Sequence, residues 1–217
     1  MCGRYTLSTV DGPAIAQRFG LIEPPAAETL GRFNVCPTEP VAIATGRDER
    51  QGRTVPWGIE VSKKFKPINA RSETIATRAP FSRFFARGDG RCLVLADGWY
   101  EWLKSETKKG DRVPFRYTVD GGAPFAFAGV WDGTGAVILT CAANEICAPV
   151  HDRMPVVLAG PEEEAAWLAG EADDVRELLL PLASGRTTVA PANPAVNRAG
   201  VEGPELLDAP EPPLTLL

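Results

Sequence analysis

The 217-residue chain lacks any run of about 18 to 20 apolar residues, the length that a membrane-spanning helix requires. Its first residues, Met1-Cys2-Gly3-Arg4-Tyr5-Thr6, also lack the basic-then-apolar layout of a secretory signal peptide. These absences exclude a transmembrane protein and predict a cytoplasmic one. In that reducing compartment the five cysteines are expected to remain thiols, and their odd number agrees with this expectation.

Metal-binding patterns are also missing. The chain has one histidine, His151, and no Cys-x-x-Cys pair, and the spacing of Cys141 and Cys147 fits no common zinc site. We therefore expect no metal and no other cofactor. Four cysteines lie in apolar stretches and are predicted to be small buried hydrophobic residues: Cys36, Cys92, Cys141 and Cys147.

Basic residues are scarce in residues 121–217, which hold 4 Lys and Arg against 14 Asp and Glu, whereas residues 1–120 hold 19 against 14. Within the first part, residues 62–91 contain eight basic side chains, opposed only by Glu73 and Asp89. Such a local concentration suits a polyanion such as nucleic acid, although charge alone is more typical of a solvated surface. The basic window comprises Lys63, Lys64, Lys66, Arg71, Arg78, Arg83, Arg87 and Arg91.

The 21 glycines and 20 prolines are spread along the chain and separate many short elements. Helices are predicted at Pro13–Phe19, capped by Asp11, at Pro161–Ala169 and at Asp173–Leu179. The sequence thus predicts one α+β domain over residues 1–207, a β-rich, barrel-like core of antiparallel or mixed sheet with peripheral helices. Residues 208–217 are expected to form an extended, mobile, Pro-rich tail. Strands are predicted at Tyr5–Ser8, Val41–Thr45, Cys92–Ala96, Phe115–Val119, Phe125–Trp131, Val137–Cys141 and Val156–Leu158.

Cys2 is the first candidate reactive residue. Removal of Met1, which is usual before a small residue, would leave a free α-amine and a thiol on one residue. Their reference pKa values of about 8 and 8.5 give both groups a reactive fraction near neutral pH. Such an aminothiol attacks acyl groups or condenses with an aldehyde to a thiazolidine. The alternative is an unremarkable residue in a frayed terminus.

Three further segments carry candidate groups. His151 is a natural proton shuttle near pH 7, although a lone histidine is more often structural. Strand alternation in 98–102 places Trp99 and Glu101 on one face, where a carboxylate beside an indole should have a raised pKa. Asn69 offers a donor and an acceptor, and Arg71 can hold a phosphate, although this segment also reads as a turn before a short helix capped by Ser72.

Five motifs in this order resemble the SOS response-associated peptidase (SRAP) family, over residues 2 to about 207. The resemblance implies a β-rich, barrel-like fold and a protein that senses abasic sites in single-stranded DNA and crosslinks to them. We also expect a monomer without metal or membrane contact, associated with the nucleoid when bound to DNA. The motifs are Met1-Cys2-Gly3-Arg4-Tyr5, Arg32-Phe33-Asn34-Val35 before Pro37, Ile68–Thr74, Asp97–Trp102 and His151-Asp152-Arg153-Met154-Pro155.

The resemblance also assigns roles. Cys2 would bond to the abasic sugar, Asn69 would hold the amine or the sugar, Glu101 would transfer protons and His151 would assist. Self-crosslinking is the implied activity, with lyase and cysteine peptidase activity as further options. The residues expected to contact DNA are Arg4, Asn34, Pro37, Trp57, Arg71, Ser72, Glu73 and Thr74.

One departure from the family pattern follows Trp57, where a second tryptophan often occurs but this chain has none; Phe65 could replace it as a stacking surface. Two other function classes remain open. Cys2-Gly3 is also typical of N-terminal-nucleophile hydrolases, including peptidases and glutamine amidotransferases. The third class is a module that binds single-stranded DNA without a covalent step.

Overall fold

The structure, a computed structural model, describes residues 2–104 and 112–208. Three α-helices, α1 (Gly12–Phe19), α2 (Phe81–Ala86) and α3 (Pro161–Ala169), accompany thirteen strands in this part of the chain. Apart from Asp208, the predicted Pro-rich tail lies outside the described residues. The strands are β1 (Tyr5–Leu7), β2 (Arg32–Val35), β3 (Pro40–Thr45), β4 (Gln51–Pro56), β5 (Asn69–Arg71), β6 (Arg91–Ala96), β7 (Gly98–Lys104), β8 (Arg112–Val119), β9 (Phe125–Trp131), β10 (Ala136–Ala142), β11 (Arg153–Pro155), β12 (Val157–Leu158) and β13 (Thr187–Pro191).

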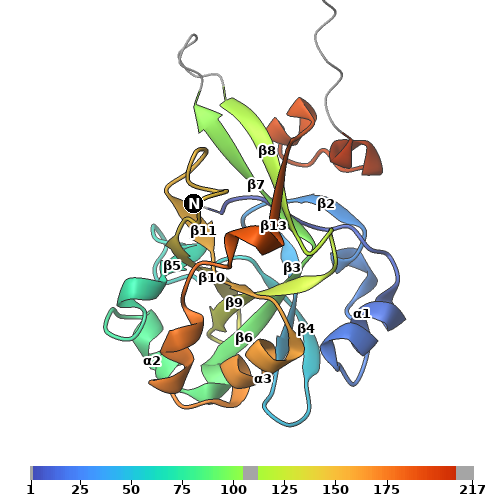
Figure 1. Cartoon of the computed structure of the whole chain (residues 1–217). Coiled ribbons are helices and arrows are strands. Elements are labelled where there is room, and N and C mark those ends of the chain that lie inside the picture. The colour runs from blue at the N-terminus through green and yellow to red at the C-terminus, as the bar shows by residue number, and fades with distance from the viewer. Residues whose placement is uncertain (1, 105–111, 209–217) are drawn as a thin grey trace, which may run out of the picture.

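The strands form two sheets. One has five strands in the order β13-β8-β7-β1-β2; the other has eight, with the path β11-β10-β9-β6-β3-β4, β12 beside β9 and β5 beside β10. Pairing is antiparallel except between β5 and β10, which are parallel. The predicted α+β class with a mixed, β-rich core is therefore confirmed, and the described strands do not close into a single barrel. The three helices lie at the periphery (Figure 1).

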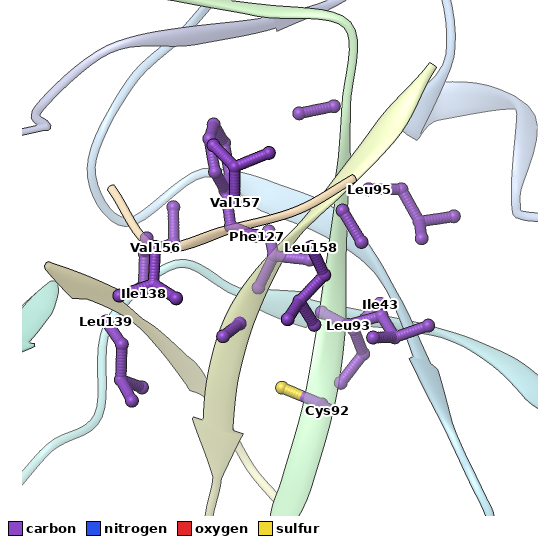
Figure 2. Close-up of a cluster of buried hydrophobic side chains, with 14 of the residues drawn as sticks. Ile43, Cys92, Leu93, Leu95, Phe127, Ile138, Leu139, Val156, Val157 and Leu158 are labelled. Carbon is purple, nitrogen blue, oxygen red and sulfur yellow. The ribbon is translucent and has the colours of Figure 1, made fainter. Parts of the chain in front are cut away.

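The main hydrophobic core lies around β6 and β9 of the eight-stranded sheet (Figure 2). Every residue of β6 is buried, and so are the first six of β9, because both faces of these central strands are covered. This explains why Cys92–Ala96 reads as a continuous apolar run rather than an alternating one. Cys92, fully buried among these side chains, behaves as the small hydrophobic residue that the sequence predicts, as do Cys36, Cys141 and Cys147.

All seven predicted strands and the first two predicted helices are present. Asp11 caps α1 as predicted, accepting a hydrogen bond from the backbone N–H of Ala14 at 2.9 Å. The predicted α-helix at Asp173–Leu179 is wrong in type: residues Asp174–Leu178 form a 3₁₀ helix. Its i-to-i+3 bonds run into Leu179, and Pro181 prevents a longer helix from continuing. None of the described helices is long and apolar enough to cross a membrane.

Glu164 on α3 joins three elements through a buried ion cluster. Its carboxylate, fully buried, lies 2.8 Å from the Nη2 of Arg18 on α1 and 3.0 Å from the Nη1 of Arg50.

Replacing one member of a buried ion pair leaves the other charges desolvated and unpaired. We predict that Glu164→Gln lowers the free energy of unfolding by about 3 kcal/mol, measured by urea denaturation. Arg176→Ala, which breaks an exposed ion pair with Asp173, serves as the control and should stay near wild type. A Glu164→Gln protein as stable as the control would contradict the prediction.

Candidate functional site

The N-terminal strand brings Cys2 alongside Glu101. In the five-stranded sheet β1 is antiparallel to β7, with Tyr5 opposite Trp99, and the backbone N–H of Tyr100 donates to the carbonyl of Arg4 at 3.0 Å. Continuing this register towards the terminus carries Cys2 along the segment that contains Glu101. The predicted alternation holds: Trp99 belongs to the main core, whereas Tyr100 and Trp102 pack in a second cluster on the other side of β7.

The eight-stranded sheet supplies the other half of the site. Strand β10 lies between β5 and β11, so that Thr140 is opposite both Arg71 and Pro155. This places the Asn69–Arg71 strand beside the segment that follows His151. The Nδ2 of Asn69 donates a hydrogen bond of 2.6 Å to the carbonyl of Cys2, joining the two halves. The Oδ1 of Asn69 is buried and has no hydrogen-bond partner among the described residues.

Cys2 is fully buried, so the terminus at this residue is packed rather than frayed. Burial raises the pKa of the Cys2 thiol well above its usual range, and the nearby carboxylate of Glu101 acts in the same direction. The thiol is therefore protonated at neutral pH and needs a proton acceptor before it can react as a thiolate. The sequence alone, using reference values, predicts a larger reactive fraction than this environment allows.

Glu101 is the most perturbed carboxyl group at the site. It is 4% exposed, and burial raises its pKa to about 7. The negative charge of Asp152 acts in the same direction. Two further titratable groups couple to it electrostatically, Cys147 and Tyr117, and burial raises the pKa of each. A carboxyl group with a pKa near 7 can both donate and accept a proton under physiological conditions.

His151 lies at the edge of the site with 29% of its side chain exposed. Its Nδ1 lies 2.9 Å from the backbone N–H of Arg153, which donates to it. Partial burial lowers the pKa of His151, although Asp152, whose Oδ1 lies 2.9 Å from the same nitrogen, opposes this shift. The neutral imidazole therefore predominates near pH 7.

A pocket of about 510 Å³ opens next to Asn69 and extends the site along the surface. Its walls combine Arg71 and Arg78 with aromatic side chains of Phe65 and Phe81. Phe65 is 53% exposed, which suits the predicted stacking of a base on its ring. Arg78, a member of the basic window that lies in none of the five motifs, is thus a candidate binding residue. Its signal was the charge concentration, not a motif.

Not all of the basic window contributes to this surface. Arg91 is 1% exposed and points into the protein, where its guanidinium lies 5.7 Å from the Trp167 ring. Lys66 pairs with Glu60 at 2.6 Å, and Arg87 pairs with Asp89. The positive charge that lines the pocket therefore comes from Arg71 and Arg78, and Lys63 and Lys64 are exposed in the segment just before Phe65.

Several residues expected to contact DNA are placed inside the protein. Trp57 is 1% exposed, with its Nε1 donating to the carbonyl of Ile68 at 2.9 Å and its ring edge-on to Tyr5. Asn34 is fully buried and Ser72 is 8% exposed. This burial argues against direct DNA contact by these three side chains in this conformation. Arg71 is exposed, and Pro37 and Thr74 are partly exposed, so these side chains can be reached from solvent.

Glu73 forms an ion pair that links two motifs. Both its oxygens accept from the guanidinium of Arg153, which also donates to the carbonyl of Thr140. This pairing lowers the pKa of Glu73 below its usual range. Glu73 therefore holds the Ser72–Thr74 turn against β10 and β11, next to Asn69 and Arg71. The positioning role of Arg153 was missed from the sequence, because its partner lies 80 residues away and leaves no local signal.

Among the described residues, no group of three or more His, Cys, Asp or Glu side chains could hold a metal ion. The site is thus composed of a buried N-terminal thiol, a carboxyl group of raised pKa, an amide and a neutral imidazole, beside a basic and aromatic pocket. These groups can carry nucleophilic attack and proton transfer.

Comparisons with known proteins identify the family of the chain. An abasic site processing protein of Bacillus subtilis, YoaM, is 32% identical over 233 residues, which cover 96% of this chain and 98% of the relative. The abasic site processing protein YedK of Escherichia coli is 35% identical over 184 residues, covering 79% and 81% of the two chains. A crystal structure of a Bacteroides thetaiotaomicron protein shares the fold, with a TM-score of 0.80 over 96% of this chain and 100% of that chain at 19% identity. A family model described as SOS response associated peptidase (SRAP) matches residues 1–199. The chain belongs to the SRAP family.

Proposed function

We propose that this protein processes abasic sites in single-stranded DNA by forming a covalent crosslink through Cys2, once Met1 has been removed. The observation that carries the proposal is the placement of Cys2, held by Asn69 and electrostatically coupled to a carboxyl group with a pKa of about 7. The relatives YoaM and YedK, both named abasic site processing proteins, support the same substrate class.

The chemistry suits these groups. An abasic sugar is in equilibrium with an open form that carries an aldehyde at C1′. The α-amine of Cys2 adds to this aldehyde and water leaves, giving an imine. The thiol then adds to the imine carbon, its proton passes to the nitrogen, and a five-membered thiazolidine closes. Because the aldehyde that drives β-elimination is consumed, the product protects the strand from breakage.

Proton transfer is needed at each step, since the buried thiol is protonated and the sugar oxygen must gain a proton as the ring opens. Glu101 is the candidate acid and base for these transfers, with neutral His151 assisting at the edge of the site. The Oδ1 of Asn69, which has no partner among the described residues, is available to accept from the α-amine of the processed chain. The strand would continue through the pocket lined by Arg71, Arg78 and Phe65.

Intact mass spectrometry tests the proposal. Purified protein mixed with a single-stranded oligonucleotide containing one abasic site should give a species equal to the processed chain plus the oligonucleotide, minus one water, without reductant. The free protein should lack Met1. A chain that fully retains Met1 yet still crosslinks would refute the aminothiol mechanism, because the reacting amine would then belong to methionine.

The exposed guanidinium of Arg71 is expected to contact phosphate. Arg71→Ala should weaken binding of abasic single-stranded DNA and reduce the slope of log affinity against log salt by about 0.7, the value for one phosphate on a single strand. Fluorescence anisotropy across a salt series measures both quantities. Arg186→Ala, a charge change at a partly exposed ion pair with Asp120 that does not line this pocket, is the control. An unchanged slope in Arg71→Ala would place the DNA on another surface.

The two rival function classes differ from the crosslinking proposal in whether an adduct forms with abasic DNA. An N-terminal-nucleophile hydrolase would hydrolyse a peptide or glutamine, with the α-amine as its base. The family description, SOS response associated peptidase, is consistent with this class. A non-covalent binding module would form no adduct of increased mass, and replacing Cys2 would leave its DNA affinity unchanged. Hydrolysis without an adduct, or affinity without an adduct, would therefore replace the crosslinking proposal.

A further inference from the structure

The last described segment crosses the outer face of the five-stranded sheet. We call residues 192–207 the C-terminal strap; it includes two 3₁₀ turns, Pro194–Asn197 and Pro204–Leu207. The strap closes a small hydrophobic cluster in which Tyr100 is buried with Ala192, Val196 and Leu206. Tyr100 precedes Glu101 on β7 and points to the opposite side of the sheet. The strap therefore packs directly behind the strand that carries Glu101.

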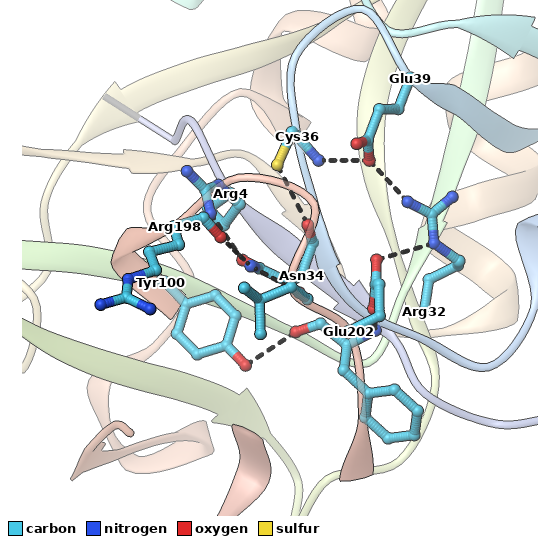
Figure 3. A network of polar contacts seen from close by, with 10 residues as sticks. Arg4, Arg32, Asn34, Cys36, Glu39, Tyr100, Arg198 and Glu202 are labelled. Atoms are coloured by element: carbon cyan, nitrogen blue, oxygen red, sulfur yellow. Dashed lines mark hydrogen bonds and ion pairs between the residues drawn. The ribbon is translucent and has the colours of Figure 1, made fainter. Parts of the chain in front are cut away.

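The strap also binds the N-terminal strand (Figure 3). Arg4, two residues after Cys2, donates from its Nη1 to the carbonyl of Val196 at 2.6 Å and to the Oδ1 of Asn34 at 2.7 Å. The Nδ2 of Asn34 donates in turn to the carbonyls of Arg198 at 3.0 Å and Val201 at 2.9 Å. Asn34, fully buried, thus uses its whole amide to connect Arg4 with the strap.

A third contact involves Trp102, the residue that follows Glu101 on β7. The Nε1 of Trp102 donates to the Oδ1 of Asn197 at 2.6 Å, and the guanidinium of Arg4 lies 5.7 Å from the Trp102 ring. Both neighbours of Glu101 on β7 are therefore held by the strap. The same segment fixes the strand of the nucleophile and the strand of the carboxyl group.

We propose that the C-terminal strap is a positioning device for the reaction, and that Asn34 and Asn197 act through it to keep Cys2 and Glu101 in register. The proposal rests on the proposed function. It accounts for the full burial of Cys2, which precedes a terminal strand of only three residues, since short terminal segments otherwise fray. It also gives Arg4 a role in this network, alongside its expected contact with DNA.

Single-turnover kinetics separate positioning from DNA binding. Asn34→Leu removes every hydrogen bond of a side chain that DNA cannot reach in this conformation. We expect the crosslinking rate at saturating DNA to fall about tenfold or more, with an unchanged half-saturating DNA concentration. A change confined to the half-saturating concentration would overturn the proposal.

Asn197 gives a second pair of variants at the surface, where folding is not at risk. Asn197→Ala removes the acceptor for Trp102 and should slow the reaction severalfold, whereas Asn197→Asp keeps an acceptor and should restore the rate. If Asn197 instead contacted DNA, the new carboxylate would repel phosphate and raise the half-saturating concentration. Glu205→Gln, an exposed change on the same strap, is the matched control.

Hydrogen exchange keeps this test independent of the crosslinking chemistry. Peptides covering residues 2–7 should exchange faster in Asn34→Leu and Asn197→Ala than in wild type and Glu205→Gln. Unchanged exchange and unchanged rates in both variants would overturn the strap proposal. If wild-type protein fails to crosslink while exchange responds as expected, the proposed function fails and the strap still holds the N-terminal strand.

Discussion

In Cys2→Ala and Cys2→Ser, the rate at which the stable, reductant-independent DNA adduct forms is expected to fall by at least about two orders of magnitude. Both substitutions keep a small second residue, so Met1 is still removed and an α-amine remains at the same place. The amine can still form an imine with the aldehyde, but alanine has no group to close the ring and serine has only a weaker nucleophile. The imine should therefore be captured only when borohydride reduces it.

The measurement is intact mass with and without borohydride. Cys92→Ala is the matched control, because it removes a thiol that is fully buried in the main core. This variant should form the adduct at the wild-type rate. A reductant-independent adduct formed by Cys2→Ala at wild-type speed would refute the thiazolidine mechanism. Loss of borohydride trapping as well would indicate that the amine, not only the thiol, is displaced.

The sequence predicts the elements that have long apolar patterns better than those that depend on partners. Strand β6 follows from five consecutive apolar residues, Cys92–Ala96, and α3 from Pro161 followed by three glutamates. Strands β5 and β11 have three residues each and form only because β10 pairs with both. No local pattern could identify them, since their hydrogen bonds are all non-local.

The same distinction separates the site residues. Alternation within 98–102 correctly places Glu101 on the face of Trp99, because strand geometry fixes it. The burial of Trp57 could not be predicted, since its pocket is completed by Tyr5 and the carbonyl of Ile68. Likewise, the sequence could not show that Arg4 and Asn34 donate to backbone carbonyls of the strap, because these partners lie 192 and 164 residues away.

Glu101→Gln is expected to slow crosslinking by about 10²–10⁴-fold while leaving the mass of the final adduct unchanged. Glutamine keeps the shape of the side chain but cannot exchange a proton. The wild-type rate, measured against pH at saturating DNA, should contain a titration with an apparent pKa near 7, and this titration should be absent from the variant. Glu177→Gln, an exposed carboxylate, is the control and should retain the wild-type profile.

Although Glu101→Gln should crosslink more slowly than wild type, it should be more stable towards unfolding above pH 7. Because the pKa of Glu101 rises from 4.5 unfolded to about 7 folded, the native state binds the proton more tightly, and stability falls as pH rises through this window. A shift of this size corresponds to roughly 3 kcal/mol at pH 8. Glu101→Gln removes this cost, so it should unfold at higher urea than wild type at pH 8 and lose that advantage near pH 4.5. A carboxyl group kept only for structure would give the reverse, a less stable variant with normal kinetics. Slower chemistry combined with higher stability above pH 7 would therefore identify Glu101 as a group retained for proton transfer at the expense of folding.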